Sequence, residues 1–172
     1  DTDPNAIDFA KGYNDAVWGQ KVAQVKAGAT NSAGMTLIGE QLAPGWDNKQ
    51  GGTIFQQALT ANPSINATIE ANDGLAGAVI TDLKTAGVAA KKVPTTGQDA
   101  TAQGLEYVLQ GWQCGSVYKP VYLEAQAAVA LATYLRAKQT PPTALLNGST
   151  TDPTNSATTE PAVLLTPIWV NA

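Results

Sequence analysis

Six residues that could bind a polar ligand occupy similar places in the sequence. Each follows a predicted strand or stands just ahead of a predicted helix. Carboxylates accept hydrogen bonds from hydroxyl groups, amides donate and accept, a lysine donates, and a flat indole packs against apolar C–H groups. Together these groups suit a neutral ligand that is rich in hydroxyl groups. The six residues are Asp3, Asn5, Trp46, Asn72, Asp99 and Lys119.

The stretch T-I-E-A-N-D-G-L-A-G, residues 68–77, shows this arrangement most clearly. A run of β-forming residues stops at Asn72-Asp73-Gly74, and helical spacing of apolar residues begins at Leu75. At such a junction in an open α/β sheet, the last strand side chains and the first helical N–H groups face one crevice. Taken alone, Asn72 or Asp73 is better explained as a helix cap, so the ligand hypothesis depends on the other junctions.

Strands and helices alternate through most of the chain, which predicts an α/β fold with a mostly parallel sheet flanked by helices. The carboxyl ends of parallel strands lie along one edge, so the six residues should converge on a single rim. Helices are expected from about residue 7, with an extension to residue 25 left open, between Asp47 and Asn62, from residue 75 to 86, from about residue 101, and at 121–138. The predicted strands are residues 35–41, 65–71, 93–96, 113–118 and 162–170.

Composition favours one polar domain and excludes several classes of partner. The 172 residues carry a net charge of −4 with only ten Lys and Arg, which argues against nucleic acid. No apolar stretch approaches the roughly 18 residues of a membrane span. The N-terminus lacks the features of a signal peptide, so we expect that any such peptide was removed or not included.

The sequence offers little for catalysis, metal binding or cofactor binding. It contains no histidine and one cysteine, Cys114, which we expect to be buried in a strand. Ser-His and Cys-His nucleophile pairs and cysteine metal sites are thereby excluded. A phosphate-bearing cofactor would call for a glycine-rich loop such as G-x-G-x-x-G, which does not occur here. We therefore predict no cofactor, no metal and no enzymatic activity.

Six short motifs resemble those of the periplasmic sugar-binding proteins of ABC importers, most closely the D-xylose-binding branch. They stand in the order and near the spacing of that family. The resemblance implies a Rossmann-like lobe, and it implies that the six residues above are sugar contacts of the carboxyl-terminal lobe. The motifs are D-T-D-P-N-A at residue 1, G-W at 45, A-N-D-G at 71, G-Q-D-A at 97, V-Y-K-P at 117 and L-L-T-P-I at 164.

The same resemblance implies how the chain is organised. Residues 1–172 would form the carboxyl-terminal lobe of a longer protein whose amino-terminal lobe is missing here. The helix at 121–138 would belong to that other lobe, and residues 140–161, rich in Thr, Pro, Asn and Ser, would form an exposed loop. The chain departs from the family in having Pro4 between Asp3 and Asn5, and in a longer loop at 147–160.

The implied function is binding of a monosaccharide, D-xylose or a related aldose, for delivery to an ABC permease. The implied location is periplasmic or extracytoplasmic, with a lipid anchor on the precursor as one option. Two alternatives use the same fold: a sugar-sensing subunit for a membrane kinase or chemoreceptor, and the effector domain of a sugar-responsive repressor. A further alternative is an α/β enzyme with Asp99 as general base and Lys119 as electrophile, which the missing histidine disfavours.

Overall fold

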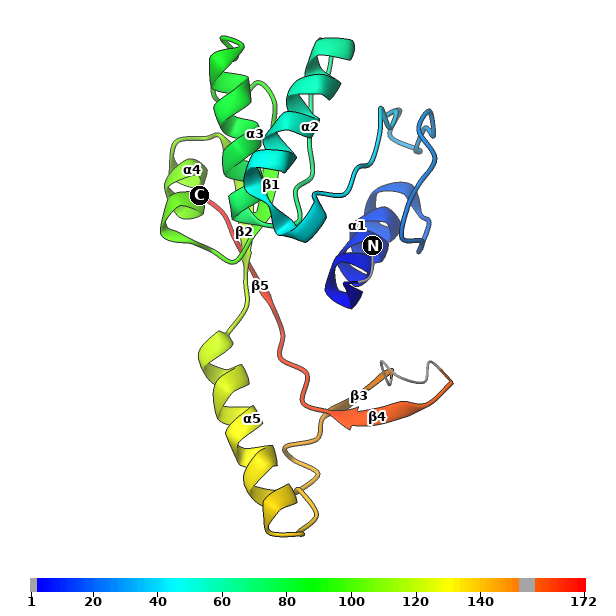
Figure 1. The fold of residues 1–172 in the computed structure, drawn as a ribbon, viewed down its shortest axis with the longest axis vertical. Coiled ribbons are helices and arrows are strands. Elements are labelled where there is room, and N and C mark those ends of the chain that lie inside the picture. The colour runs from blue at the N-terminus through cyan, green and yellow to red at the C-terminus, as the bar shows by residue number, and fades with distance from the viewer. Residues whose placement is uncertain (1–2, 152–156) are drawn as a thin grey trace. The chain divides into compact units, whose positions relative to one another are not determined.

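The computed structural model describes residues 3–151 and 157–172. The chain divides into two compact units. The first contains the residues up to Val117 together with Trp169–Ala172, and the second is Tyr118–Ile168. Figure 1 shows the order of the elements along the chain.

Four α-helices of the first unit begin at a residue whose side chain accepts a hydrogen bond from a helical N–H. Such caps satisfy donors that have no partner inside the helix. Asp47 caps α2 at the predicted start of that helix. The third helix ends within one residue of the predicted end at 86, and Gly87, with a φ of 75°, follows it. The helices are α1 (Pro4–Trp18), the 3-10 turn η1 (Pro44–Trp46), α2 (Asn48–Ala61), α3 (Asp73–Thr85) and α4 (Ala102–Leu109).

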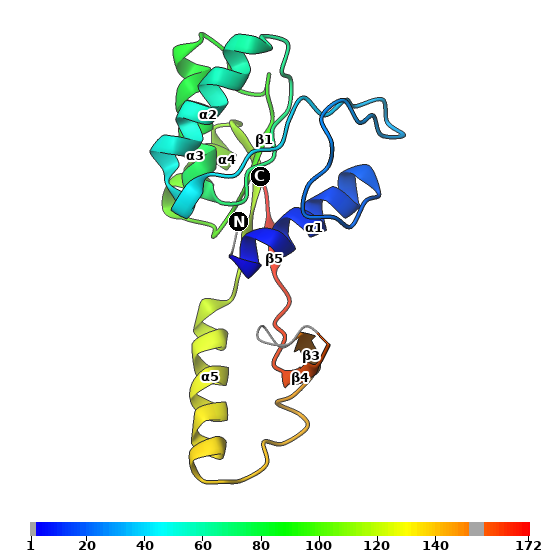
Figure 2. The same cartoon turned by 45° about the vertical axis from the view of Figure 1, so that its right-hand side comes forward.

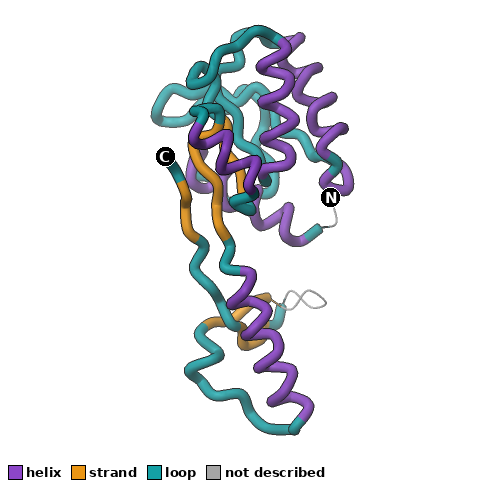
Figure 3. The backbone as a smooth tube through the Cα atoms, turned by 90° about the vertical axis from the view of Figure 1, so that its left-hand side faces the viewer, coloured by secondary structure: helices purple, strands orange, loops and turns teal. Residues whose placement is uncertain are grey.

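The main sheet has three strands in the order β1, β2, β5. They are β1 (Thr95–Gln98), β2 (Gln113–Tyr118) and β5 (Ile168–Val170), and β1 pairs with β2 in parallel. Figure 3 shows the strand nearest the C-terminus beside β2. A Cβ at Gly115 would lie 2.4 Å from the Trp169 ring, so the glycine lets the indole lie directly on β2. The predicted α/β fold with parallel strands and flanking helices is confirmed.

The core of the first unit lies where α3 packs against β1. Ile80 and Leu83 of α3 are fully buried, and Phe55 of α2 and Val93 ahead of β1 pack in the same region. Both α2 and α4 pack on α3, as Figure 2 shows. Gly52 permits the close approach of α2, since a Cβ there would already touch Ala78 at 3.4 Å.

The strand predicted at residues 65–71 is wrong, although the segment does run beside β1. One main-chain hydrogen bond joins them, from Thr68 N to Pro94 O at 3.0 Å. The next two bonds use side chains: Glu70 N donates to Thr96 Oγ1, and Thr96 N donates to a Glu70 carboxylate oxygen, both at 3.1 Å. Side chains have therefore replaced the regular main-chain ladder.

The strand predicted at residues 35–41 is also wrong. Only an isolated antiparallel bridge forms there, between Thr30 and Thr36, and the rest of the segment is loop. Asn31 Oδ1 accepts from the main-chain N–H groups of Ala33 and Met35, each at 3.0 Å, which closes a tight turn. Glu40 turns its carboxylate towards Val25 N at 2.9 Å. The extension of the first helix to residue 25 does not occur, because α1 ends at Trp18 and the next residue is left-handed.

Two smaller predictions also need correction. Cys114 is exposed rather than buried, because side chains alternate along β2 and its neighbours Gln113 and Gly115 take the inner positions. The strand predicted at 162–170 is interrupted: β4 ends at Ala162, and β5 begins at Ile168 after Pro167. The two strands belong to different sheets, since β4 pairs with β3 and β5 with β2, and residues 163–167 between them are in no strand.

The second unit contains α5 (Val121–Arg136) and a hairpin of β3 (Gly148–Thr151) with β4 (Thr159–Ala162). The helix predicted at 121–138 is thus present. The segment predicted as an exposed loop, 140–161, contains β3 and most of β4, and its residues 152–156 lie outside the described part of the chain. No residue of α5 is buried. Its exposed large apolar residues are Val121, Tyr122, Leu123, Val129 and Leu135.

The carboxylate of Asp73 ties four elements of the first unit together. One oxygen accepts from Ser116 Oγ of β2 at 2.7 Å and from Gln113 Nε2 at 2.9 Å. The other accepts from the main-chain N and the hydroxyl of Thr101, at 2.7 and 3.0 Å. A Cβ on either Gly97 of β1 or Gly104 of α4 would collide with this carboxylate. The glycines leave the room that lets a buried carboxylate hold α3, β1, α4 and β2 in place.

Replacing Ser116 by alanine tests this network. The change removes the 2.7 Å bond to Asp73 and leaves the main-chain N–H of Ala100 without the Ser116 hydroxyl that it now binds at 2.9 Å. The free energy of unfolding should fall by about 1–3 kcal/mol, because buried polar groups lose their partners. Urea denaturation measures it, with Ser64→Ala, at an exposed serine, as the control. Equal stability of the two variants would contradict the role assigned to Asp73.

Candidate functional site

Asp99 lies in a strained turn directly after β1. Asp99 and Ala100 have φ values of 98° and 47°, a region that residues other than glycine seldom adopt. Such conformations cost of order 1–3 kcal/mol each and persist only where the surroundings hold them. Here Asp99 N donates to Val117 O and Ala100 N donates to Ser116 Oγ, both at 2.9 Å, and Thr101 N donates to Asp73. Three successive N–H groups thus fix the turn that presents the exposed Asp99 side chain.

Asn72 stands at the start of α3 and is half-buried. Its Oδ1 accepts from Leu75 N at 2.8 Å, which confirms the capping interpretation. The cap uses Oδ1, and the Nδ2 hydrogens have no part in it. Gln98 Nε2 donates to Ala71 O at 3.4 Å, so the residues just before Asn72 and Asp99 are in contact. The structure therefore brings these two predicted residues to neighbouring positions.

Asp3 and Trp46 are in direct contact, although 43 positions separate them. The indole Nε1 donates to Asp3 Oδ2 at 2.7 Å, and Asn5 N donates to Oδ1 of the same carboxylate at 2.9 Å. The bond from Trp46 is the main reason why the pKa of Asp3 is lowered. Phe9 meets the indole edge-on, with ring centroids 6.3 Å apart. Asp3 and Phe9 together orient the Trp46 ring, while the Asn5 side chain is exposed beside them.

The beginnings of α2 and α3 meet at one end of the first unit. A Cβ on Gly74 would lie 2.7 Å from the side-chain amide of Asn48, and one on Gly51 would lie 2.6 Å from Leu75 Cδ2. Figure 1 shows that this end also contains the carboxyl ends of β1 and β2. The Trp46 turn, which directly precedes α2, thus stands near the junction that carries Asn72. Lys119 follows β2, as predicted, and belongs to the second unit.

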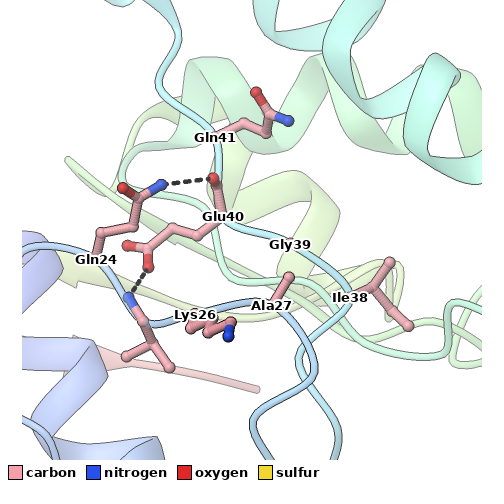
Figure 4. A pocket seen from close by; sticks show the side chains of 8 residues that line it. Gln24, Lys26, Ala27, Ile38, Gly39, Glu40 and Gln41 are labelled. Atoms are coloured by element: carbon pink, nitrogen blue, oxygen red, sulfur yellow. Dashed lines mark hydrogen bonds between the residues drawn. The ribbon is translucent and has the colours of Figure 1, made fainter.

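A hollow of about 500 Å3 lies elsewhere in the first unit, between residues 24–27 and 38–41 (Figure 4). None of the six predicted residues lines it. Its main polar group, the Glu40 carboxylate, already accepts from Val25 N, from Tyr13 Oη at 3.1 Å and from Asn14 Nδ2. Burial, followed by the charge of Glu40, raises the pKa of Tyr13. We assign Glu40 to holding this loop against α1.

The sequence did not predict that Asp73 links several elements or that the Glu70 side chain binds Thr96 of β1. Asp73 was considered only as a cap, yet it is 3% exposed and accepts four hydrogen bonds. An acid in the first turn of a helix is common, so Asp73 gave no signal of a second role. The glycines at 97 and 104 gave no signal, because their closeness to Asp73 exists only in the folded chain.

Within residues 3–151 and 157–172, no cluster of acidic or cysteine side chains could hold a metal ion. Among these residues there is also no helix with the length and hydropathy needed to cross a membrane.

Comparison with known proteins matches residues 1–140 to the periplasmic binding protein domain family. The D-xylose-binding periplasmic protein of Escherichia coli (strain K12) is 35% identical over 142 residues, which cover 82% of this chain and 41% of that protein. The D-xylose-binding periplasmic protein of Haemophilus influenzae is 32% identical over 142 residues, which cover 81% of this chain and 40% of that protein. The chain therefore spans about two fifths of the length of these relatives.

Two solved structures resemble the fold. A periplasmic solute-binding protein of an ABC transporter from Actinobacillus succinogenes 130z, with bound D-allose, has a TM-score of 0.62 and 25% identity over 79% of this chain and 41% of that one. A carbohydrate transporter solute-binding protein from Chloroflexus aurantiacus, in complex with D-glucose, has a TM-score of 0.64 and 25% identity. That match covers 76% of this chain and 38% of the other. From the match over residues 1–140, this chain belongs to the periplasmic binding protein domain family.

Proposed function

We propose that this chain is the carboxyl-terminal sugar-binding part of a solute-binding protein that delivers D-xylose or a related aldose to an ABC permease. The observation that carries the proposal is the set of polar and aromatic residues at the junctions of the first unit, where strained and capped backbone presents Asp99 and Asn72 beside the Trp46 turn. Two relatives are named as D-xylose-binding proteins, and two solved structures contain D-allose and D-glucose. All of these sugars are aldoses.

Each residue has a role in the proposal that follows from its chemistry. Asp99 accepts hydrogen bonds from sugar hydroxyls, and Asn72 donates from Nδ2 while its Oδ1 caps α3. The Trp46 ring packs against the C–H face of the sugar, held in place by Asp3. For Asn5 and Lys119 the proposal rests on their motifs, D-P-N-A and V-Y-K-P.

The length of the relatives supports a second lobe outside this chain. The chain spans about two fifths of theirs. In the second unit, α5 exposes Val121, Leu123, Val129 and Leu135, and a helix with such a surface normally packs against another element. We place α5 in the amino-terminal lobe of the intact protein. The proposal puts that protein in the periplasm or its equivalent, because both curated relatives are named as periplasmic, and it assigns it no catalytic step.

The isolated chain should bind D-xylose weakly, at millimolar concentrations or above. Sugar receptors with two lobes gain affinity as both close on the ligand and exclude water. Each charged hydrogen bond that is lost costs about 1.5–3 kcal/mol, so losing two or three weakens binding by several decades. NMR titration of the 172-residue chain with D-xylose measures this. Saturation at micromolar sugar would show that this rim needs no second lobe.

In the full-length protein, Asp99→Ala should weaken D-xylose binding about 10- to 100-fold, because a charged acceptor is lost. Calorimetry measures the affinity. Asp15→Ala, at an exposed aspartate of α1, is the matched control and should leave it unchanged. Equal affinities of the two variants would remove Asp99 from the site.

Replacement of Trp46 separates stacking from positioning. Trp46→Phe keeps an aromatic face but loses the N–H that binds Asp3, whereas Trp46→Ala loses both. In the full-length protein we expect the alanine variant to bind D-xylose more weakly than the phenylalanine variant, with both still folded by circular dichroism. If the two variants bind equally well, the ring face does not contact the sugar.

A further inference from the structure

Glu70 lies two residues before Asn72 and replaces a main-chain acceptor at the edge of β1. Its half-buried side chain accepts from Thr96 N at 3.1 Å, while Glu70 N donates to Thr96 Oγ1. The pairing of β1 with β2 is irregular at the same point, between Thr95 and Gly97. In a regular parallel ladder the Thr96 N–H would meet a carbonyl, which does not titrate. Here the link between two segments of the first unit depends on a carboxyl group.

The surroundings of this carboxyl favour its protonated form. Burial raises the pKa of Glu70 to about 7, against the opposing effects of the nearby Thr68 hydroxyl and Thr96 amide. The elements against it are its own segment and β1, whose next titratable groups are Asp73 and Asp99. Neither contributes to this shift, and within the described residues no ionised side chain does.

We propose that Glu70 is a pH-sensitive positioning residue, which ties the segment carrying Asn72 to β1 and so sets the spacing of Asn72 and Asp99. Protonated, the group is neutral and its carbonyl oxygen accepts from Thr96 N at little desolvation cost. Ionised, the same group loses hydration that the Thr96 amide and the Thr68 hydroxyl replace only in part, which favours separation of residues 65–72 from β1. The effect of Glu70 on stability does not depend on the proposed function. Its effect on affinity, tighter sugar binding below neutral pH, rests on that function.

The sign of the stability effect follows from linkage. The folded chain holds the Glu70 proton more tightly than the unfolded chain, in which the pKa is near 4.5. This contribution to stability is fully present below that value and is lost as the pH rises towards 7. Asp3 and Asp47 have lowered pKa values, so their titration changes stability only at pH values below this range. Burial also raises the pKa of Asp82 from 3.8, so its ionisation lowers stability as the pH rises, as that of Glu70 does. A Glu70 variant is therefore needed to separate the contribution of Glu70.

The test follows the sugar-free chain from pH 5 to 8 by NMR, with the Glu70 side-chain carboxyl carbon and the amides of Thr96 and Asn72 as probes. We expect one common midpoint near 7. In thermal unfolding, Glu70→Gln should remove a large part of the fall in melting temperature across this range. Glu106→Gln, at an exposed glutamate of α4, should leave it in place.

A carboxyl midpoint near 4.5, or amides of Thr96 and Asn72 that do not move with it, would overturn the proposal. Because the NMR titration uses the unmodified chain, that result stands even if Glu70→Gln does not fold. A separate measurement uses sugar. The full-length protein should bind D-xylose several-fold more tightly at pH 6 than at pH 8, and Glu70→Gln should abolish the difference. Absence of any sugar binding, with the sugar-free midpoint in place, would refute the proposed function and leave the role of Glu70 intact.

Discussion

The buried carboxylate of Asp73 is the interaction on which the rest of the first unit depends. It accepts four hydrogen bonds from groups in β2 and at the start of α4, while it stands at the first position of α3. A buried charge is tolerated only where hydrogen bonds compensate its lost hydration. Each donor must therefore be in place, and the two glycines that face the carboxylate, Gly97 and Gly104, must stay small. One residue thus couples the register of the sheet to the positions of two helices.

The same network prepares the candidate site. Ser116 binds Asp73 through its hydroxyl and accepts from Ala100, so the strained turn at Asp99 is held by the group that holds α3. Asn72 lies next to Asp73 and caps the same helix. Polar side chains that meet a ligand are more effective when their backbone is fixed beforehand, because less freedom is lost on binding. We therefore see the rim as pre-organised, with Asp99 and Asn72 placed by the network and Trp46 placed by Asp3.

Patterns along the sequence predicted the α/β class, the helices and the strand at 113–118, because apolar periodicity and caps are local signals. They failed at residues 65–71, where the Glu70 carboxylate takes the place of a main-chain acceptor. They also failed at 35–41, where only one isolated bridge forms and the Glu40 carboxylate accepts from Val25 N. Nothing local announces that choice. For the site, the contact between Asp3 and Trp46 and the nearness of Asn72 to Asp99 agree with a common rim. The role of Asp73 depends on distant glycines and was beyond the reach of the sequence.

We propose that this rim recognises a neutral aldose through hydroxyl-directed groups and an aromatic face. Calorimetry of the full-length protein with a panel of pentoses, hexoses, nucleotides and amino acids tests it most directly. We expect tight binding of D-xylose or a related aldose and no measurable heat from nucleotides or amino acids. Tight binding of a nucleotide or an amino acid, with no response to any aldose, would contradict it.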